Sequence, residues 1–241
     1  MKKLILGTAI AALTAGAALA EGHSVVRLGT EGAYPPYNFI NDAGEVDGFE
    51  RALGDELCAR AELTCEWVTN DWDSIIPNLV SGNYDAIIAG MSITDERLEV
   101  IDFTENYTQP DPSAFLALAD ADVDLSSAVI AAQAATIQAS YAAGAGMTVL
   151  EFATPEESVA AVRAGEADAV LADRAYLAPL AEAEADLAFT GENVLIGGGV
   201  GMGIRKSDTE LRDKFTAAIQ SMKADGSLNA LIEEWEIGEL F

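Results

Sequence analysis

The chain has few basic residues, a single histidine and only two cysteines. Its 241 residues include 13 lysines and arginines against 40 aspartates and glutamates, which gives a formal net charge of -27 at pH 7. Such an acidic surface repels nucleic acid and anionic lipid head groups, so nucleic-acid binding is not expected. The only histidine, His23, lies close to the N-terminus, which leaves no Ser-His or Cys-His pair, and no G-x-S-x-G motif occurs. Acid pairs occur at many spacings in so acidic a chain, and an enzyme that uses two carboxylates therefore stays open without positive support.

The first 20 residues have the pattern of a secretory signal peptide. Lys2 and Lys3 precede an apolar run over residues 4–19, and Ala18-Leu19-Ala20 has the form of an A-x-A cleavage site. A membrane anchor is the alternative, but this run is rich in Ala and Gly and shorter than the roughly 20 residues that span a bilayer. We expect a periplasmic protein of about 220 residues that begins near Glu21. Without Lys2 and Lys3 its formal charge is -29.

The two cysteines, Cys58 and Cys65, are separated by six residues. An even count in an exported chain favours a disulfide. A metal site is the alternative, but a closed zinc site needs four ligands, and the chain has no third cysteine and no second histidine. We expect no metal and no cofactor.

The N-terminal half has the order of a parallel α/β sheet. Apolar periodicity and turn residues predict strands and helices in alternation, with Asp73 as the cap of the second helix. The five expected elements are a strand at 25–29, a helix at 49–61, a strand at 64–68, a helix at 73–80 and a strand around 87–88. The β-α-β-α-β order indicates a parallel sheet covered by helices.

Residues 74–89 resemble residues 158–172. Each segment has an amphipathic helix, a glycine stop, two residues, and then Asp-Ala followed by an apolar strand. Chance similarity is one explanation, since glycine stops are common. The other is two lobes built alike, each presenting a strand end to a shared crevice. Pro110 and Pro112 favour one crossing between the lobes, and the glycine-rich run 197–203 favours a second crossing, after which the chain returns to the first lobe.

The two strand ends carry opposite charges that suit an amino acid. Arg97 can pair with a carboxylate through its planar guanidinium, helped by Ser92 and by backbone N–H groups near Gly90. Asp173 can take the ammonium group from the other lobe. Each has a plain structural alternative: a surface ion pair with a neighbouring glutamate for Arg97, and a helix N-cap for Asp173.

Several sequence runs closely resemble the periplasmic polar amino-acid-binding proteins of ABC importers, in particular the histidine and lysine/arginine/ornithine binders. These runs are T-E-G-A-Y-P-P-Y-N-F (30–39), D-W-D-S-I-I-P-N-L (71–79), Y-D-A-I-I-A-G-M-S-I-T-D-E-R (84–97), D-F-T (102–104) and G-M-G-I-R-K (201–206). The resemblance implies an α/β chain with the type II periplasmic-binding-protein fold, two lobes joined by two hinge strands with the ligand in the cleft. It implies lobe 1 at 21–110 and 200–241 and lobe 2 at 111–199.

The resemblance also implies roles for single residues. Arg97 matches the arginine that holds the ligand carboxylate, and Asp173 matches the acid that binds its ammonium. Tyr34 and Trp72 match the residues that sandwich the ligand side chain, and Cys58 and Cys65 match a short disulfide. The expected ligand-binding residues are Glu31, Tyr34, Trp72, Ala89, Gly90, Ser92, Arg97, Gln133, Thr136 and Asp173.

Departures from those binders bear on which amino acid is bound. Ala89 and Gly90 stand where the binders have serines, Trp72 replaces a smaller aliphatic residue, and the loop that often reads Q-G-T-T is here 133–136, Q-A-A-T. Glu31 matches an acid that reaches a cationic ligand side chain, although a solvated loop acid is its alternative. We therefore expect a monomeric receptor for arginine, lysine, ornithine or histidine that closes around its ligand and serves an ABC permease. The alternatives are a cyclohexadienyl or arogenate dehydratase on the same scaffold, or a ligand-sensing subunit.

Overall fold

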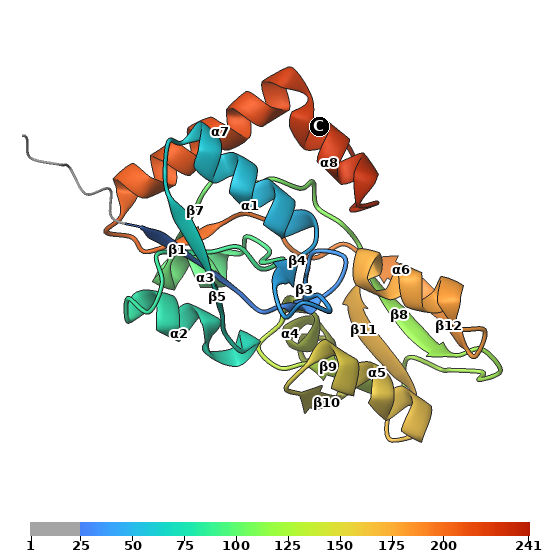
Figure 1. Ribbon diagram of the computed structural model, residues 1–241. Coiled ribbons are helices and arrows are strands. Elements are labelled where there is room, and N and C mark those ends of the chain that lie inside the picture. The colour runs from blue at the N-terminus through green and yellow to red at the C-terminus, as the bar shows by residue number, and fades with distance from the viewer. Residues whose placement is uncertain (1–24) are drawn as a thin grey trace, which may run out of the picture.

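The computed structural model describes residues 25–241 and contains two five-stranded sheets that lie side by side (Figure 1). The expected signal peptide and His23 lie outside these residues. None of the helices in 25–241 is long and apolar enough to cross a membrane.

The first sheet is built mainly from the N-terminal part of the chain. Its strands follow the order β5 (Cys65–Thr69), β1 (Val26–Thr30), β6 (Ala86–Ile87), β13 (Gly203–Ile204) and β7 (Asp102–Phe103). Strand β1 is parallel to β5 and to β6, as the sequence predicts. Strand β13 returns from the C-terminal part and is antiparallel to β6 and β7, so the complete sheet is mixed. A small antiparallel sheet, β2 (Ala33–Tyr34), β3 (Asn38–Ile40) and β4 (Val46–Asp47), lies between β1 and the first helix in the chain.

The helices of the first lobe are α1 (Phe49–Arg60), α2 (Ile75–Val80), α3 (Asp95–Val100), α7 (Thr209–Asp225) and α8 (Ser227–Glu234). All except α3 bury apolar side chains in the core, as amphipathic helices do, whereas no residue of α3 is buried. Leu53 and Leu57 of α1 are fully buried, in the same core as Phe215 and Ile219 of α7. Helices α7 and α8 both pack against α1, which is visible at the top of Figure 1. The C-terminal segment therefore returns to the first sheet, as expected.

The second sheet has the order β10 (Thr148–Phe152), β9 (Val129–Gln133), β11 (Ala169–Asp173), β8 (Ser113–Leu118) and β12 (Leu187–Val194). Its helices are α4 (Ile137–Gly144), α5 (Pro155–Ala164) and α6 (Arg174–Ala183). Strands β10, β9 and β11 are parallel, and β8 joins β11 and β12 in antiparallel pairs. The two segments that resemble each other in sequence have the same local structure. Helix α2 is followed by β6 in the first sheet, and helix α5 is followed by β11 in the second sheet.

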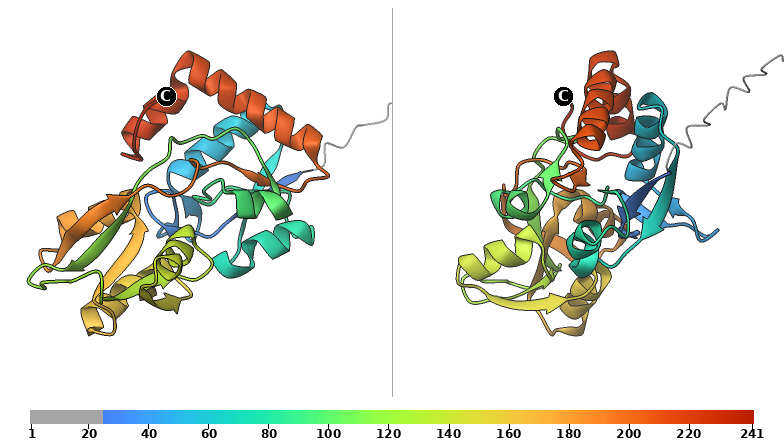
Figure 2. Two further views of the ribbon diagram at one scale, coloured as in Figure 1. Left: turned by 180° about the vertical axis from the view of Figure 1, so that it is seen from behind. Right: turned by 90° about the vertical axis from the view of Figure 1, so that its left-hand side faces the viewer.

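The chain passes between the sheets twice, once after β7 and once after β12 (Figure 2). The two crossings meet each other, because the Tyr107 N–H donates to the Val200 carbonyl at 2.7 Å. Val200 also forms isolated β-bridges with Ser92 and Thr108.

Threonine side chains cap three helices. The Thr94 and Thr136 side chains cap α3 and α4, and Thr154 with Glu157 forms a complete capping box at α5. The predicted cap at Asp73 is wrong. A 3-10 turn over Trp72–Ser74 takes in Asp73 before α2 begins, and neither this turn nor α2 has a side-chain cap.

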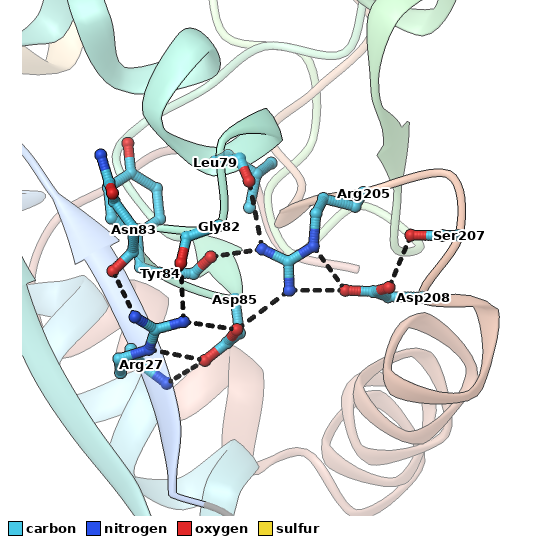
Figure 3. A network of polar contacts seen from close by, with 9 residues as sticks. All are labelled: Arg27, Leu79, Gly82, Asn83, Tyr84, Asp85, Arg205, Ser207 and Asp208. Carbon is cyan, nitrogen blue, oxygen red and sulfur yellow. Dashed lines mark hydrogen bonds and ion pairs between the residues drawn. The ribbon is translucent and has the colours of Figure 1, made fainter.

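Two further ties hold the first lobe together. Cys58 of α1 and Cys65 of β5 form a disulfide, which confirms that prediction. Arg205, directly after β13, donates to the carbonyl of Leu79 at 3.1 Å and to a carboxylate oxygen of Asp85 at 2.9 Å (Figure 3). Arg27 of β1 donates to the same carboxylate, so Asp85 joins the start of the first sheet to the strand that returns to it.

Candidate ligand-binding site

A cleft lies between the two sheets and is lined by residues of both. The side chains that line it fill most of it, since the free space inside amounts to only about 30 Å³. All ten residues expected to bind the ligand line it, together with two that were not expected. The lining residues are Glu31, Tyr34, Trp72, Ala89, Gly90, Ser92, Arg97, Gln133, Thr136, Ile137, Gln138 and Asp173.

Arg97 enters the cleft from the first turn of α3. Its guanidinium donates to the Ser92 carbonyl at 2.8 Å and to the Ala135 carbonyl at 3.4 Å, and lies 5.3 Å from the centre of the Trp72 ring. Burial lowers the pKa of Arg97 to about 10, which leaves it charged at neutral pH. Within 25–241 Arg97 forms no ion pair, so the surface-ion-pair alternative is wrong.

Asp173 faces Arg97 from the end of β11. It stands at the N-cap position of α6, but its side chain makes no cap hydrogen bond, so the helix-cap alternative is wrong too. The carboxylate instead accepts from the Tyr34 hydroxyl at 2.9 Å and from Nε2 of Gln138 at 2.8 Å. Burial raises the pKa of Asp173, while these donors and the Arg97 charge oppose that rise.

Tyr34 reaches across the cleft from β2. Besides the bond to Asp173, its ring stacks on Tyr176 of α6, with centroids 4.5 Å apart and planes inclined by 8°. One face of the Tyr34 ring is therefore covered by the second lobe. The Gly90 backbone lies nearby, since a Cβ built on Gly90 would stand 3.6 Å from the Tyr34 ring.

Glu31 follows β1 and is largely buried. Nε2 of Gln133, at the end of β9, donates to its carboxylate at 2.6 Å, across the cleft, and donates to the Ala153 carbonyl at 3.1 Å. Burial raises the pKa of Glu31 to about 7, and the hydrogen bond from Gln133 opposes that rise. A buried carboxylate with a cross-cleft partner is not the solvated loop acid of the alternative interpretation.

Two expected donors serve other groups. The Gly90 N–H donates to the Glu50 carboxylate at 2.6 Å, so this N–H itself is engaged within the first lobe, and the expected help from N–H groups near Gly90 stays a prediction. Gly90 adopts a φ of +60°, a region that favours glycine. The Thr136 hydroxyl donates to the Gln133 carbonyl at 2.7 Å and accepts from the N–H of Ala139 at 3.1 Å. Thr136 thereby presents the N-terminus of α4 to the cleft.

The comparison with known families agrees with this geometry. Residues 26–239 match the family described as bacterial extracellular solute-binding proteins, family 3. The chain belongs to this family.

Curated relatives of this solute-binding protein extend over nearly the whole chain. The L-arginine-binding protein of Pseudomonas aeruginosa is 32% identical and aligns with 98% of this chain and 96% of its own length. The lysine/arginine/ornithine-binding periplasmic protein of Escherichia coli is 30% identical, with 98% and 97% covered. Both relatives are named as binding proteins, and the second is named as periplasmic.

Solved structures share the type II fold of these proteins. A periplasmic His/Glu/Gln/Arg/opine family-binding protein from Silicibacter pomeroyi, in complex with lysine, is 70% identical with a TM-score of 0.85, covering 88% of this chain and 96% of that one. An ancestral amino acid-binding protein described as a precursor of cyclohexadienyl dehydratase is 28% identical with a TM-score of 0.80, covering 88% and 95%.

The two lining residues of this solute-binding protein that were not expected are Ile137 and Gln138. Gln138 is only 5% exposed and donates to the Ser113 hydroxyl at 3.0 Å as well as to Asp173. The sequence carried one signal for it, a polar side chain in the first turn of a helix that begins behind a Thr cap. Its partners are 25 and 35 residues away along the chain, so the pairing itself had no local signal.

Proposed function

We propose that this protein is an extracytoplasmic receptor that captures a free L-amino acid with a cationic side chain and delivers it to an ABC permease. The observation that carries the proposal is the arrangement of charged side chains in the cleft between the two lobes. One arginine and two carboxylates line it, and each of the two lobes contributes at least one of these charges. The one positive and two negative side chains complement the ligand, which has one carboxylate, one ammonium group and one cationic side chain.

In this proposal Arg97 pairs with the ligand carboxylate and Asp173 with its ammonium. Taking a zwitterion out of water is favourable only when both ends are paired, and the two partners stand on different lobes. Binding therefore favours the closed arrangement over an open one, which is the differential affinity that a hinge motion requires.

Glu31 supplies the preference for a cationic side chain, with Trp72 and Tyr34 as aromatic neighbours. The names of the relatives support this choice, since they include arginine and lysine/arginine/ornithine binders, and the lysine complex points the same way. Ala89 and Gly90 leave space where hydroxyl groups would otherwise stand. In this proposal each lobe contributes to the site, lobe 1 comprises 21–110 and 200–241, lobe 2 comprises 111–199, and the hinge lies in the two crossings.

The test is calorimetry on protein freed of any co-purified ligand by unfolding and refolding. Arginine, lysine, ornithine and histidine are titrated beside glutamine, and one or more of the cationic amino acids is expected to bind most tightly. Arg97→Ala is expected to lower the affinity for every amino acid by about 100-fold or more, because a buried carboxylate loses its partner. Arg163→Ala, which removes an arginine paired with Glu184 away from the cleft, is the matched control.

Two results would contradict the proposal. Unchanged binding by Arg97→Ala would show that the carboxylate is held elsewhere. Turnover of prephenate or arogenate by the purified protein would favour the dehydratase alternative, whereas we propose a receptor with no enzymatic activity that acts as a monomer.

A further inference from the structure

Glu50, outside the cleft lining, is a fully buried carboxylate within 25–241 that has no cationic partner. It occupies the second position of α1, where the helix dipole favours negative charge. Its two oxygens accept from three donors. Nδ2 of Asn38 donates to Oε2 at 2.7 Å, the Gly90 N–H donates to Oε1 at 2.6 Å, and the Tyr107 hydroxyl also bonds to Oε1.

The three donors belong to three segments that shape the ligand site. Asn38 uses its other end, Oδ1, to accept from the N–H of Gly32 at 2.7 Å, and so holds the loop between Glu31 and Tyr34. Gly90 lines the cleft itself. Tyr107 lies in the first crossing between the lobes, and its N–H is bonded to the second crossing.

Two of these three groups can act only as hydrogen-bond donors toward Glu50. The Gly90 N–H can only donate, and Asn38 must present its NH2 group to Glu50, because its carbonyl oxygen already accepts from Gly32. These two donors bond to different oxygens of Glu50. The site therefore requires a side chain with two acceptor oxygens, whether or not the carboxyl group is ionised.

We propose that Glu50 is a positioning residue for ligand binding. It fixes the Gly90 segment, the loop of Glu31 and Tyr34, and the first crossing in one relative arrangement, without touching the ligand. This inference rests on the proposed function, since it assigns Glu50 to the amino-acid site described above. Helix α1 is the rigid element to which these three parts of the site are attached.

The first test is Glu50→Gln, which keeps the size of the side chain but offers a single acceptor oxygen. The new amide NH2 must then face either Asn38 or Gly90, donor against donor. With L-arginine as the probe, the affinity is expected to fall about tenfold or more, the effect of losing one buried hydrogen bond to a charged acceptor. Leu57→Val on the same helix is the matched control, because Leu57 is fully buried in the core and does not line the cleft. It is expected to lower the melting temperature and leave the affinity unchanged.

The second test exchanges the donor and the acceptor. In the double variant Glu50→Gln/Asn38→Asp, the new amide can donate to the new carboxylate, whose other oxygen still accepts from Gly32, while the amide oxygen accepts from Gly90. Affinity for arginine is expected to return to within about threefold of the unsubstituted protein, since every donor has an acceptor again. A role in general stability alone predicts instead that the folded Glu50→Gln protein binds arginine with unchanged affinity, so that there is no loss of affinity for the double variant to reverse.

The outcomes separate the two proposals. Failure of the unsubstituted protein to bind any amino acid of the panel would overturn the proposed function. Tight binding by the unsubstituted protein, with equal affinity for arginine in Glu50→Gln, would overturn the positioning role alone. A double variant that is folded but binds no better than Glu50→Gln would also overturn it.

Discussion

Tyr34 and Asp173 are bonded to each other twice across the ligand cleft. The Tyr34 hydroxyl donates to the Asp173 carboxylate at 2.9 Å and accepts from the Asp173 backbone N–H at 3.2 Å. The two residues are 139 positions apart in the chain and belong to different lobes. The bonds therefore exist only when the lobes are close together, which makes them part of the free energy of closure.

Tyr34→Phe removes these bonds and keeps the stacking on Tyr176. The affinity for the bound amino acid is expected to fall about tenfold, the usual effect of a hydrogen bond to a charged group, mainly through faster dissociation. Stopped-flow measurement of the dissociation rate checks this. Tyr141→Phe, the loss of a hydroxyl on α4 away from the cleft, is the control. An unchanged dissociation rate in Tyr34→Phe would show that the cross-cleft bonds do not hold the closed arrangement.

The disulfide between Cys58 and Cys65 is expected to act on stability and not on binding. It closes a short loop that joins α1 to β5, and neither cysteine lines the cleft. Cys58→Ser/Cys65→Ser is expected to lower the free energy of unfolding by about 2 kcal/mol, because the unfolded chain gains freedom. Urea denaturation measures this change, and a reducing agent should reproduce it in the unsubstituted protein only. A loss of ligand affinity in the folded double variant would contradict the prediction.

Local signals in the sequence were enough for most of the fold. Thr94 and Thr154 cap their helices through partners three residues away, so their roles can be predicted from the local sequence. The prediction at Asp73 failed because a 3-10 turn and an α-helix compete over the same few residues. Capping residues and apolar periodicity do not show whether the first turn is a 3-10 helix or an α-helix, or at which of two neighbouring residues the α-helix begins.

Some residues of the candidate site could likewise be predicted from the sequence, and others could not. Asp173 stands at the end of β11, and Arg97 lies in the first turn of the helix that follows β6. The order of strands and helices locates both places before any contact is known. Glu50 has no such signal, because its partners lie 12, 40 and 57 residues away and the residue looks like an ordinary acid in the first turn of a helix. Gln133 was assigned to the ligand, whereas in the structure its amide is already bonded to Glu31 and Ala153. Such pairings depend on tertiary packing, which the periodicity of the sequence does not encode.

Asp85 is expected to contribute to stability in a pH-dependent way. Burial alone would raise the pKa of Asp85, but hydrogen bonds from Arg27 and Arg205 outweigh this effect and lower it to about 2, below the ordinary value of 3.8. An acid whose pKa is lower in the folded state stabilises the fold above its ordinary pKa, and that contribution is lost as the pH falls toward the folded value.

Asp85→Asn is therefore expected to melt at a lower temperature than the unsubstituted protein above pH 5, with a difference that shrinks between about pH 4 and pH 2. Thermal melts over this range check the result. The control is Asp122→Asn, at an exposed aspartate of the second lobe. A difference in melting temperature that stays constant down to pH 2 would show that the charge of Asp85 is not what stabilises the tie to Arg27 and Arg205.

Ligand binding is expected to depend on pH through Glu31, whose pKa is raised, whereas that of Asp85 is lowered. Burial raises the pKa of Glu31 to about 7, so its carboxyl group is mostly protonated at pH 6 and mostly ionised at pH 8. A cationic ligand side chain pairs only with the ionised form, and the protein must release a proton to bind it. The affinity for arginine is therefore expected to rise about tenfold between pH 6 and pH 8, which is the change in the ionised fraction of a group with this pKa.

Calorimetry in buffers of different ionisation enthalpy should detect the released proton at pH 6. Glutamine, whose side chain is neutral, is expected to bind with little change over the same range. Glu31→Gln should remove the pH dependence and narrow the preference for arginine over glutamine, because the only carboxylate assigned to the ligand side chain is gone. If arginine bound to Glu31→Gln with the same pH profile as to the unsubstituted protein, another group would have to carry the titration, and Glu31 would not be the residue that selects a cationic ligand.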